Sequence, residues 1–443
     1  MAFFAVAAVG YFGVYDAVML AIAAAACLPT WRPYILLLAL SVQDSPGQSP
    51  KSLYVTVAGI AALMLLDGMI SRRSARNTRI QSTELWRLMG VGAVVVVYGA
   101  VSSFYQHRYG LHEQSAYRPW WLVSLLMFVM MCTGWLAYRE MIVDRLFRTR
   151  LSTVCACVIV HVLLIGGLQT VLGPSFGASP QGAQEMLSQN QLIDPSERGM
   201  ARLTGPFDSP NMLAMVPALF MLLFLGAQQG RQVSPIFIAG FLVVGFTVAL
   251  LGAARTMFVF YASAGAALLW TRSRSRAMLM MVVSLPLLLM IDIPWGDMLR
   301  LIRLENFQSF GYRGIFWEAV IFGMEGKDWL FGMGVTHFPV FFEAHTGMPA
   351  ADPHNWILSV FGMFGVAGLV FYVYLAWRLG RQYLTSCGRY RAIVICLVLM
   401  YYFRDLSNMP YLLNNHPVTC LNWIVLGVAL QRERDSIEEQ LPC

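Results

Sequence analysis

The chain has 443 residues, of which 58% are hydrophobic and only 12% are charged. Soluble domains carry about 25% charged residues, so this composition excludes an ordinary soluble protein. The formal net charge of +7 comes mainly from arginines dispersed along the chain, and this dispersion excludes nucleic acid as a partner. We predict an all-α, polytopic integral membrane protein, with residues 1–443 forming a single transmembrane domain.

Apolar runs follow one another from end to end, and many reach the roughly 20 residues that cross a bilayer. They predict helices over 3–28, 32–43, 53–71, 85–105, 119–138, 151–173, 211–228, 235–253, 256–271, 277–292, 356–377, 390–406 and 417–430. Because the first two ranges are ambiguous, we expect about twelve spans.

Basic clusters between the apolar runs predict the orientation of the chain. The clusters are Arg72, Arg73, Arg76 and Arg79; Arg139, Arg145, Arg148 and Arg150; Arg272, Arg274 and Arg276; and Arg378, Arg381, Arg389 and Arg391. An even number of predicted helices separates each cluster from the next, so all of them fall on one side. That side is expected to be the cytoplasm, because positive loops stay inside.

The two longest polar stretches then fall on the opposite, periplasmic side. The smaller loop spans 174–210, and the larger loop spans 293–355. Within the larger loop, "WEAVIFGM" and "HFPVFFEA" predict short amphipathic helices on the membrane or lining a cavity. Loops of this length are usually functional or disordered, and we expect part of an active site in 293–355.

Three arginines lie on the expected outer side, where positive charge is disfavoured. Arg202 precedes a span in "ARLTGPFDSPNMLA", Arg255 lies in a tight turn in "LLGAARTMFVF", and Arg313 lies in "FGYRGIFWEAV". Each one alone is explained as well by an ion pair with a carboxylate; the candidates are Asp208, Asp292, Glu318 and Asp352. Three together, with few acids near two of them, favour an anionic ligand. The planar guanidinium matches a phosphate or pyrophosphate.

Two histidines in the larger loop are candidates for a general base. His354 directly precedes a predicted helix, with Asn355 available as a donor to a ligand and free N–H groups expected at the helix start. His337, in "GMGVTHFPV", is its rival in the same loop. An imidazole with a pKa of about 6.5 accepts a proton near neutral pH. The structural alternative for each histidine is a hydrogen-bonded helix-end residue.

Several motifs of other catalytic classes are missing from the sequence. It contains no Asp-x-Asp, HExxH, P-loop or GxSxG motif and no Cys/His spacing typical of a metal site. We therefore expect neither a metal ion nor a cofactor. Arginines would then offset the charge of a departing pyrophosphate. Most of the eight cysteines lie in or beside apolar runs, and no disulfide framework is expected.

One stretch carries a family resemblance. "HNWILSVFGMFGVAG" places His354 and Asn355 nine residues before Gly365, with two residues between Gly365 and Gly368. This resembles the H-[NSQ]-x9-G-x-x-[GTY] signature of the O-antigen ligases of the bacterial inner membrane. "GPFDSPNMLA", "YRGIFWEAV" and "LFGMGVTHF" occur in a similar order, so the likeness runs roughly over 200–380.

The resemblance implies a metal-independent glycosyltransferase with its site at the periplasmic face. Its donor would be an O-antigen glycan on undecaprenyl pyrophosphate, and its acceptor a sugar hydroxyl of lipid A–core. His354 matches the general base, and Arg255 and Arg313 match arginines that hold the pyrophosphate. Arg202 precedes the Pro-Asn helix start that contains Asn211, and both are carried over as substrate-binding residues. One departure is Ala254, where relatives often have serine before the turn arginine.

Three other functions remain open at this point. An O-antigen polymerase shares the diffuse pattern and the donor, but passes the glycan to another lipid-linked unit. A protein O-glycosylating transferase would use a Ser or Thr acceptor. A transporter of lipid-linked glycans would grip the phosphate without catalysis, and should tolerate His354→Ala. The clustering of unusual charges at one face, rather than through the membrane depth, favours an enzyme.

Overall fold

The computed structural model describes a large part of the chain. The described residues are 30–41, 60, 63–64, 83–109, 120–144, 146–173, 176, 203–207, 209–228, 232–252, 254–273, 310–346, 355–403, 412–413, 416 and 418–430. The expected helices 3–28 and 277–292 lie outside these residues, and so does 53–71 except for positions 60, 63 and 64.

Every regular element in this part of the chain is a helix. The elements are α3 (Arg32–Ser41), α6 (Thr83–Tyr109), α7 (Trp120–Val143), α8 (Phe147–Leu172), α10 (Pro210–Ala227), α11 (Pro235–Leu251), α12 (Arg255–Arg272), α15 (Phe310–Gly323), α16 (Gly326–Phe331), α17 (His337–Thr346), α18 (Trp356–Thr385), α19 (Gly388–Val398), the π-helix η4 (Leu399–Phe403) and α20 (Val418–Ala429). Among the described residues, five helices (α6, α7, α8, α10 and α18) are long and apolar enough to cross a membrane. The all-helical, membrane-type fold is confirmed at this level.

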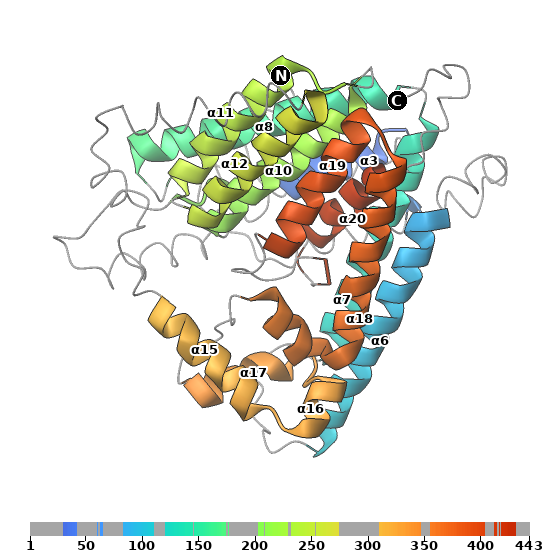
Figure 1. Cartoon of the computed structure of the whole chain (residues 1–443), viewed down its shortest axis with the longest axis vertical. Coiled ribbons are helices and arrows are strands. Elements are labelled where there is room, and N and C mark those ends of the chain that lie inside the picture. Colours follow the sequence, from blue (N-terminus) through green and yellow to red (C-terminus); the bar gives the residue numbers. More distant parts are fainter. Residues whose placement is uncertain are drawn as a thin grey trace.

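The helices form two regions around one hydrophobic core (Figure 1). Helices α8, α10, α11, α12 and α19 make up the upper region, where α10 packs against α8, α11, α19 and α20. Helix α10 is apolar on all sides and almost wholly buried, as expected of a central helix. The long helices α6, α7 and α18 run down one side of the molecule, and α15, α16 and α17 gather at their lower end.

The described basic clusters lie at one end of this unit, as their spacing predicts. The guanidinium of Arg272 donates to the carbonyl of Val233, before α11, at 2.6 Å. Arg389, at the start of α19, donates to the carbonyl of Gln228 at the end of α10. Helix α8 runs antiparallel to α10, so Arg150 at its start lies at this same end. We call this the basic end, and the opposite end the outer end.

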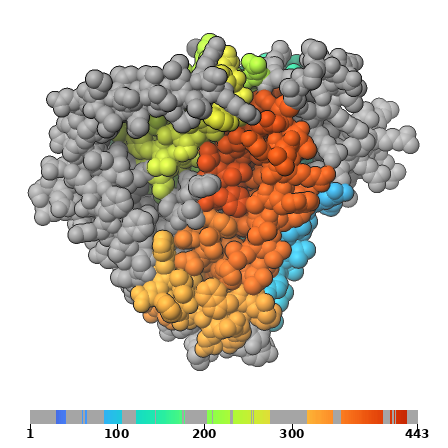
Figure 2. Space-filling view, viewed as in Figure 1, coloured from blue at the N-terminus to red at the C-terminus, as the bar shows by residue number. Residues whose placement is uncertain are grey.

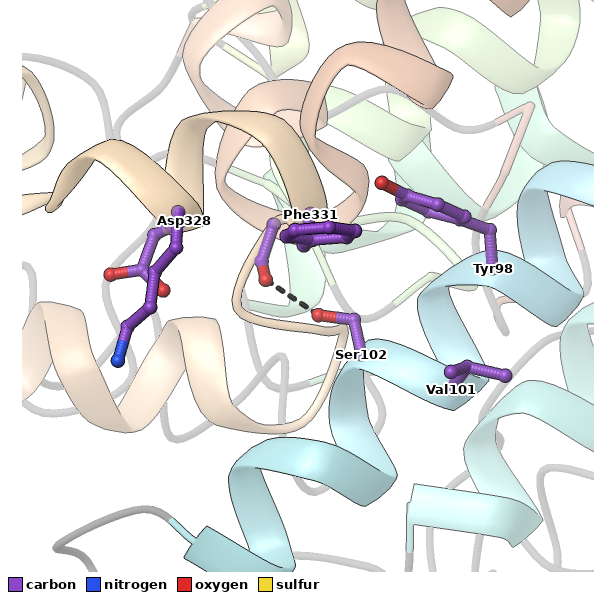
Figure 3. Close-up of a pocket in the computed structure, with 7 residues that line it drawn as sticks. Tyr98, Val101, Ser102, Asp328 and Phe331 are labelled. Carbon is purple, nitrogen blue, oxygen red and sulfur yellow. Dashed lines mark hydrogen bonds between the residues drawn. The ribbon is translucent and has the colours of Figure 1, made fainter.

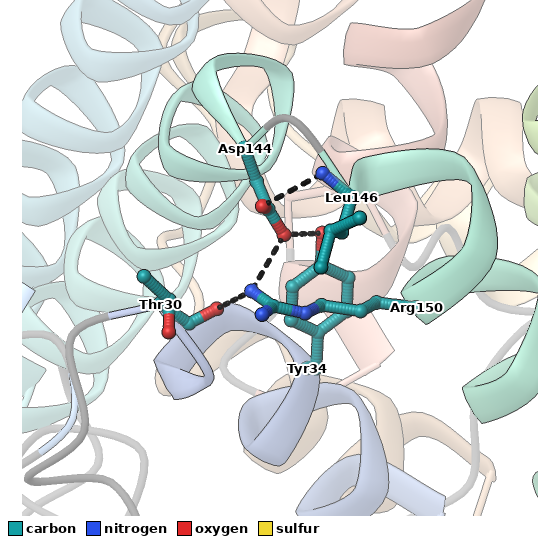
Figure 4. Close-up of polar contacts among 5 residues, drawn as sticks. All are labelled: Thr30, Tyr34, Asp144, Leu146 and Arg150. Carbon is teal, nitrogen blue, oxygen red and sulfur yellow. Dashed lines mark hydrogen bonds and ion pairs between the residues drawn. The ribbon is translucent and has the colours of Figure 1, made fainter.

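At the basic end, a polar cluster joins α3 to the turn between α7 and α8 (Figure 4). Asp144 pairs with Arg150 at 3.0 Å and accepts a hydrogen bond from the Tyr34 hydroxyl at 2.7 Å. The Arg150 guanidinium lies 4.7 Å from the centre of the Trp31 ring. Partner groups on two segments thus satisfy this arginine, which assigns it a structural role.

The larger loop and α18 differ from expectation in three ways. Both short helices expected in the loop are present, but α15 begins at Phe310, before the "WEAVIFGM" segment. A third helix, α16, fills the interval between them. Helix α18 continues to Thr385 and is broken at Gly365, where φ is 57° and ψ is −148°. Length and hydropathy predict none of these details, because they depend on contacts between segments.

The sequence predicts no disulfide framework, and among the described cysteines one is disulfide-bonded. Cys387, in the turn before α19, is disulfide-bonded. The free cysteines among the described residues are Cys132, Cys155, Cys157, Cys396 and Cys420. All five lie inside helices, where the sequence places them in apolar runs.

Candidate functional site at the outer end

Asn355 forms the N-cap of α18 at the outer end. Its side-chain oxygen accepts hydrogen bonds from the backbone N–H groups of Ile357 at 3.0 Å and Leu358 at 3.3 Å. This arrangement orients the amide, because the oxygen must face the helix and the NH₂ group then faces away from it. It also corrects an expectation: two N–H groups of the first turn are occupied by the cap and do not remain free for a ligand.

The residue after Asn355 anchors the start of α18 to η4. The Trp356 ring is buried, stacks on Tyr372 with ring centres 4.7 Å apart, and donates through its indole N–H to the Tyr402 carbonyl at 3.4 Å. Helix η4 packs against α12, whose first residue is Arg255. The backbone of Arg255 and the cap of α18 are therefore connected through one π-helix, an element that often occurs at functional sites.

The start of α10 is bound tightly to the turn between α11 and α12. The backbone N–H of Leu203 donates to the carbonyl of Leu251 at 3.0 Å, beside the turn that carries Arg255. Gln169 of α8 fixes the same segment, because its amide both donates to the Gly205 carbonyl and accepts from the Gly205 N–H. Asn211, half-buried in the first turn of α10, donates its backbone N–H to Ser209 Oγ.

His337 begins α17 and is buried, with 9% of its surface exposed. Its Nδ1 lies 3.2 Å from the hydroxyl of Thr336. The next residue, Phe338, packs so closely against Gly362 of α18 that a Cβ there would meet its ring at 1.9 Å. His337 is thus held between segments of the outer end. Its burial is more typical of a positioning residue than of a base that contacts an acceptor hydroxyl directly.

The remaining sequence-predicted residues are placed only in part. Arg313 lies in the first turn of α15, which packs against α17 and α18. The side chains of Arg313 and Arg255 lie outside the described part of the structure, and so do Arg202 and His354 entirely. Figure 2 shows residues of α15 to α17 at the lower surface of the molecule, below α18.

The break in α18 is filled by the loop that follows α16. The N–H groups of Met333 and Gly334 donate to the carbonyls of Gly362 and Met363, at 2.7 and 3.1 Å. If the helix continued past Gly365, those carbonyls would accept hydrogen bonds from backbone N–H groups of the next turn of α18. We call this junction of 332–334 with 362–365 the splice. Its backbones approach so closely that a Cβ on Gly365 would meet the Leu330 carbonyl oxygen at 2.3 Å.

Helix α6 holds the same loop from the other side (Figure 3). The hydroxyl of Ser102 donates to the Gly332 carbonyl at 2.5 Å, and the hydroxyl of Tyr98 donates to the Leu330 carbonyl at 2.9 Å. The Tyr98 ring stacks on Phe331 with ring centres 6.1 Å apart. A mainly apolar pocket of about 370 Å³ opens beside these contacts; it is lined by Tyr98, Val101, Ser102, Lys327, Asp328, Phe331 and Gly332.

Metal-type clusters are not found among the described side chains: no three His, Cys, Asp or Glu residues gather there.

The sequence does not single out Ser102, Tyr98 or Tyr402, because hydroxyls and aromatic rings within apolar runs look like ordinary residues of a membrane span. The one available signal was the pair of glycines in "GMG", at Gly332 and Gly334, which have positive φ angles of 72° and 84°.

Comparison with known proteins gives no further identification. Neither the models of protein families nor the curated proteins yield a match to this chain.

Proposed function

We propose that this chain is a metal-independent glycosyltransferase of the O-antigen ligase type in the bacterial inner membrane. It transfers an O-antigen glycan from undecaprenyl pyrophosphate to a sugar hydroxyl of lipid A–core at the periplasmic face. His354 acts as the general base, and Arg255 and Arg313 bind the pyrophosphate. Arg202, Asn211, Asn355 and His337 bind or orient the substrates.

The observation that carries the proposal is the shared end of the helices that bear these residues. Helices α12 and α18 begin at the outer end, with Arg255 and Asn355 at their starts, and Arg313 lies in the first turn of α15. The described arginines at the basic end instead donate to carbonyls, pair with Asp144 or lie over aromatic rings. Cations placed at helix N-termini, where the dipole is also positive, favour an anion such as pyrophosphate.

The chemistry requires a base and a cationic site around one carbon atom. His354 removes the proton of the acceptor hydroxyl while its oxygen bonds to the anomeric carbon of the donor glycan. The bond from that carbon to the pyrophosphate oxygen breaks, and undecaprenyl pyrophosphate leaves with its charge offset by the arginines. A single direct displacement of this kind inverts the anomeric configuration. The Asn355 amide NH₂, oriented away from α18 by its capping role, is placed to donate to a sugar or phosphate oxygen.

The test is a reconstituted transfer assay with purified protein, undecaprenyl-pyrophosphate glycan and lipid A–core, in EDTA. Wild type is compared with His354→Ala and His337→Ala by the ladder of glycan-capped core on a gel. We expect a ladder that is lost with His354→Ala and weakened but retained with His337→Ala.

Each alternative gives a different result in this assay. Longer glycans on the lipid carrier, without capped core, would make the protein a polymerase, and transfer to a Ser or Thr peptide would make it a protein transferase. Folded protein that binds the donor and transfers nothing would contradict the enzyme and favour a transporter. Transfer that occurs only when EDTA is left out would contradict the metal-independent mechanism.

A further inference from the structure

The splice joins two segments that carry candidate site residues. The loop 332–334 leads within three residues to His337, and the outer part of α18 begins with the cap at Asn355. We propose that Ser102 and Tyr98 of α6 are positioning residues, which hold the splice and thereby fix both segments for transfer. This inference rests on the proposed function and adds residues to it that no sequence motif marks.

Helix α18 consists of two pieces at the outer end. At Gly365 the backbone leaves helical geometry, so the outer piece, 356–364, is not continued by hydrogen bonds of the same helix. Within a membrane protein, carbonyls freed by a break must find other donors. The N–H groups of Met333 and Gly334 supply them. The direction of the outer piece is therefore set by the loop as well as by the rest of α18.

The loop 332–334 is itself held by α6. A loop of this kind has no regular hydrogen bonds of its own, and its backbone carbonyls need donors once buried. Ser102 and Tyr98, one turn apart on α6, donate to the carbonyl of Gly332 in the loop and to that of Leu330 in the last turn of α16, directly before the loop. Ser102 is buried with 7% of its surface exposed, so water cannot readily replace its hydroxyl.

The splice is connected through the chain to two site residues, Asn355 and His337. From Met363 to Asn355 the outer piece spans about two helical turns, or roughly 12 Å, and a short helix behaves as a rigid lever over that length. At the far end of the outer piece, Trp356 contacts η4, which packs against α12, so a shift of the piece also reaches these elements. A shift at the splice is thus transmitted along the outer piece to Asn355. It is also transmitted to His337, which follows the loop 332–334 by three residues. Displacements of about 1 Å at reacting groups can lower rates by about a hundredfold.

The experiment uses the full-length protein in detergent or nanodiscs and two variants that each remove one hydroxyl, Ser102→Ala and Tyr98→Phe. The matched control is Thr247→Ala, because Thr247 donates its hydroxyl to a carbonyl of its own helix on the exposed side of α11. Amide hydrogen exchange at Met333 and Gly334 reports the splice directly. Transfer kinetics report kcat and the KM for the lipid-linked donor.

We expect both variants to speed exchange at Met333 and Gly334 by about threefold to tenfold, as the loss of one hydrogen bond predicts. For Ser102→Ala we expect kcat to fall about tenfold while KM stays within about twofold, since misplacement affects the transition state more than ground-state binding. Thr247→Ala should leave both readouts at the wild-type level. Tyr98 is half-exposed, so Tyr98→Phe keeps the test decisive even if Ser102→Ala does not fold.

Other results overturn the inference in distinguishable ways. Unchanged exchange in both variants would show that α6 does not hold the splice. Faster exchange with unchanged kcat would show that the splice is held by α6 but does not position the site. A wild-type protein without any transfer activity would overturn the proposed function, and the positioning role with it, while the exchange rates would still decide whether α6 holds the splice.

Discussion

Helices α10 and α18 are both apolar, and both contain a residue that disturbs a helix, but the two disturbances have opposite outcomes. Pro217 lies inside α10, and the helix continues through it. Gly365 lies inside α18, and the helix breaks there. The difference lies in what the neighbouring segments supply to the freed backbone groups.

Near Pro217, a side chain from a neighbouring helix donates to the carbonyl beside the freed one. Proline removes the N–H that would serve the Leu213 carbonyl. One residue along, the hydroxyl of Tyr261 in α12 donates to the Ala214 carbonyl at 2.7 Å. Around Gly365, a whole loop supplies backbone donors. Helix α10 thus continues with a side-chain donor beside its freed carbonyl, whereas α18 breaks where a docked loop supplies backbone donors.

The largest effect is expected from Gly365→Ala. The φ and ψ angles at this position are almost restricted to glycine, which costs of order 1–3 kcal/mol for another residue, and the added methyl meets the Leu330 carbonyl oxygen at 2.3 Å. We expect a destabilisation of about 2–6 kcal/mol in total, measured as a lower thermal unfolding midpoint in detergent. Gly380→Ala is the control in the same helix, since nothing lies within 4 Å of a Cβ there; an equal loss in both variants would contradict the splice.

A smaller effect is expected when the cap of α18 is removed. Asn355→Ala loses two hydrogen bonds to the first turn and should lower stability by about 0.5–2 kcal/mol. Asn355→Asp keeps the cap but removes the NH₂ donors. If the amide also binds substrate, Asn355→Asp will unfold like wild type and transfer glycan more slowly. Wild-type transfer rates in Asn355→Asp would leave the residue with a capping role alone.

The side-chain donor of α10 predicts a further, still smaller change. Tyr261→Phe removes one buried hydrogen bond and should cost about 1 kcal/mol. Tyr374→Phe serves as the comparison, because that ring packs against Trp377 and makes no hydrogen bond among the described residues. Thermal unfolding of the two variants decides the point, and equal midpoints would show that the Tyr261 hydroxyl does not support α10.

The smallest effect is expected from Pro217→Ala. Alanine restores the N–H to Leu213 but leaves a small void in a fully packed region, and these two changes oppose each other. We expect a net change below about 1 kcal/mol. Combined with Tyr261→Phe, it gives a double-mutant cycle. A cost of Tyr261→Phe that shrinks in the Pro217→Ala background would show that the hydroxyl compensates for the proline.

The sequence predicted the helices well wherever hydrophobicity alone decides them. The ranges expected for α10, α11 and α12 begin and end within two residues of those observed, because an apolar run bounded by polar residues determines its own place in a membrane. The common end of the basic clusters follows from the same pattern. The positions of Arg255 and Asn355 at helix starts also follow, since each adjoins such a boundary; the place of Arg313 in the first turn of α15 does not.

Tertiary structure alone decided the break in α18, its partner loop and the roles of Ser102 and Tyr98. In isolation, "ILSVFGMFGVAGLV" is a continuous apolar run, and a glycine within it costs a helix only about 1 kcal/mol. The break becomes favourable when Met333 and Gly334, about thirty residues earlier in the chain, bring their N–H groups to the carbonyls it frees. Local sequence determines where a helix can form; whether it can break depends on donors from a distant segment, because no water is present in the membrane to take their place.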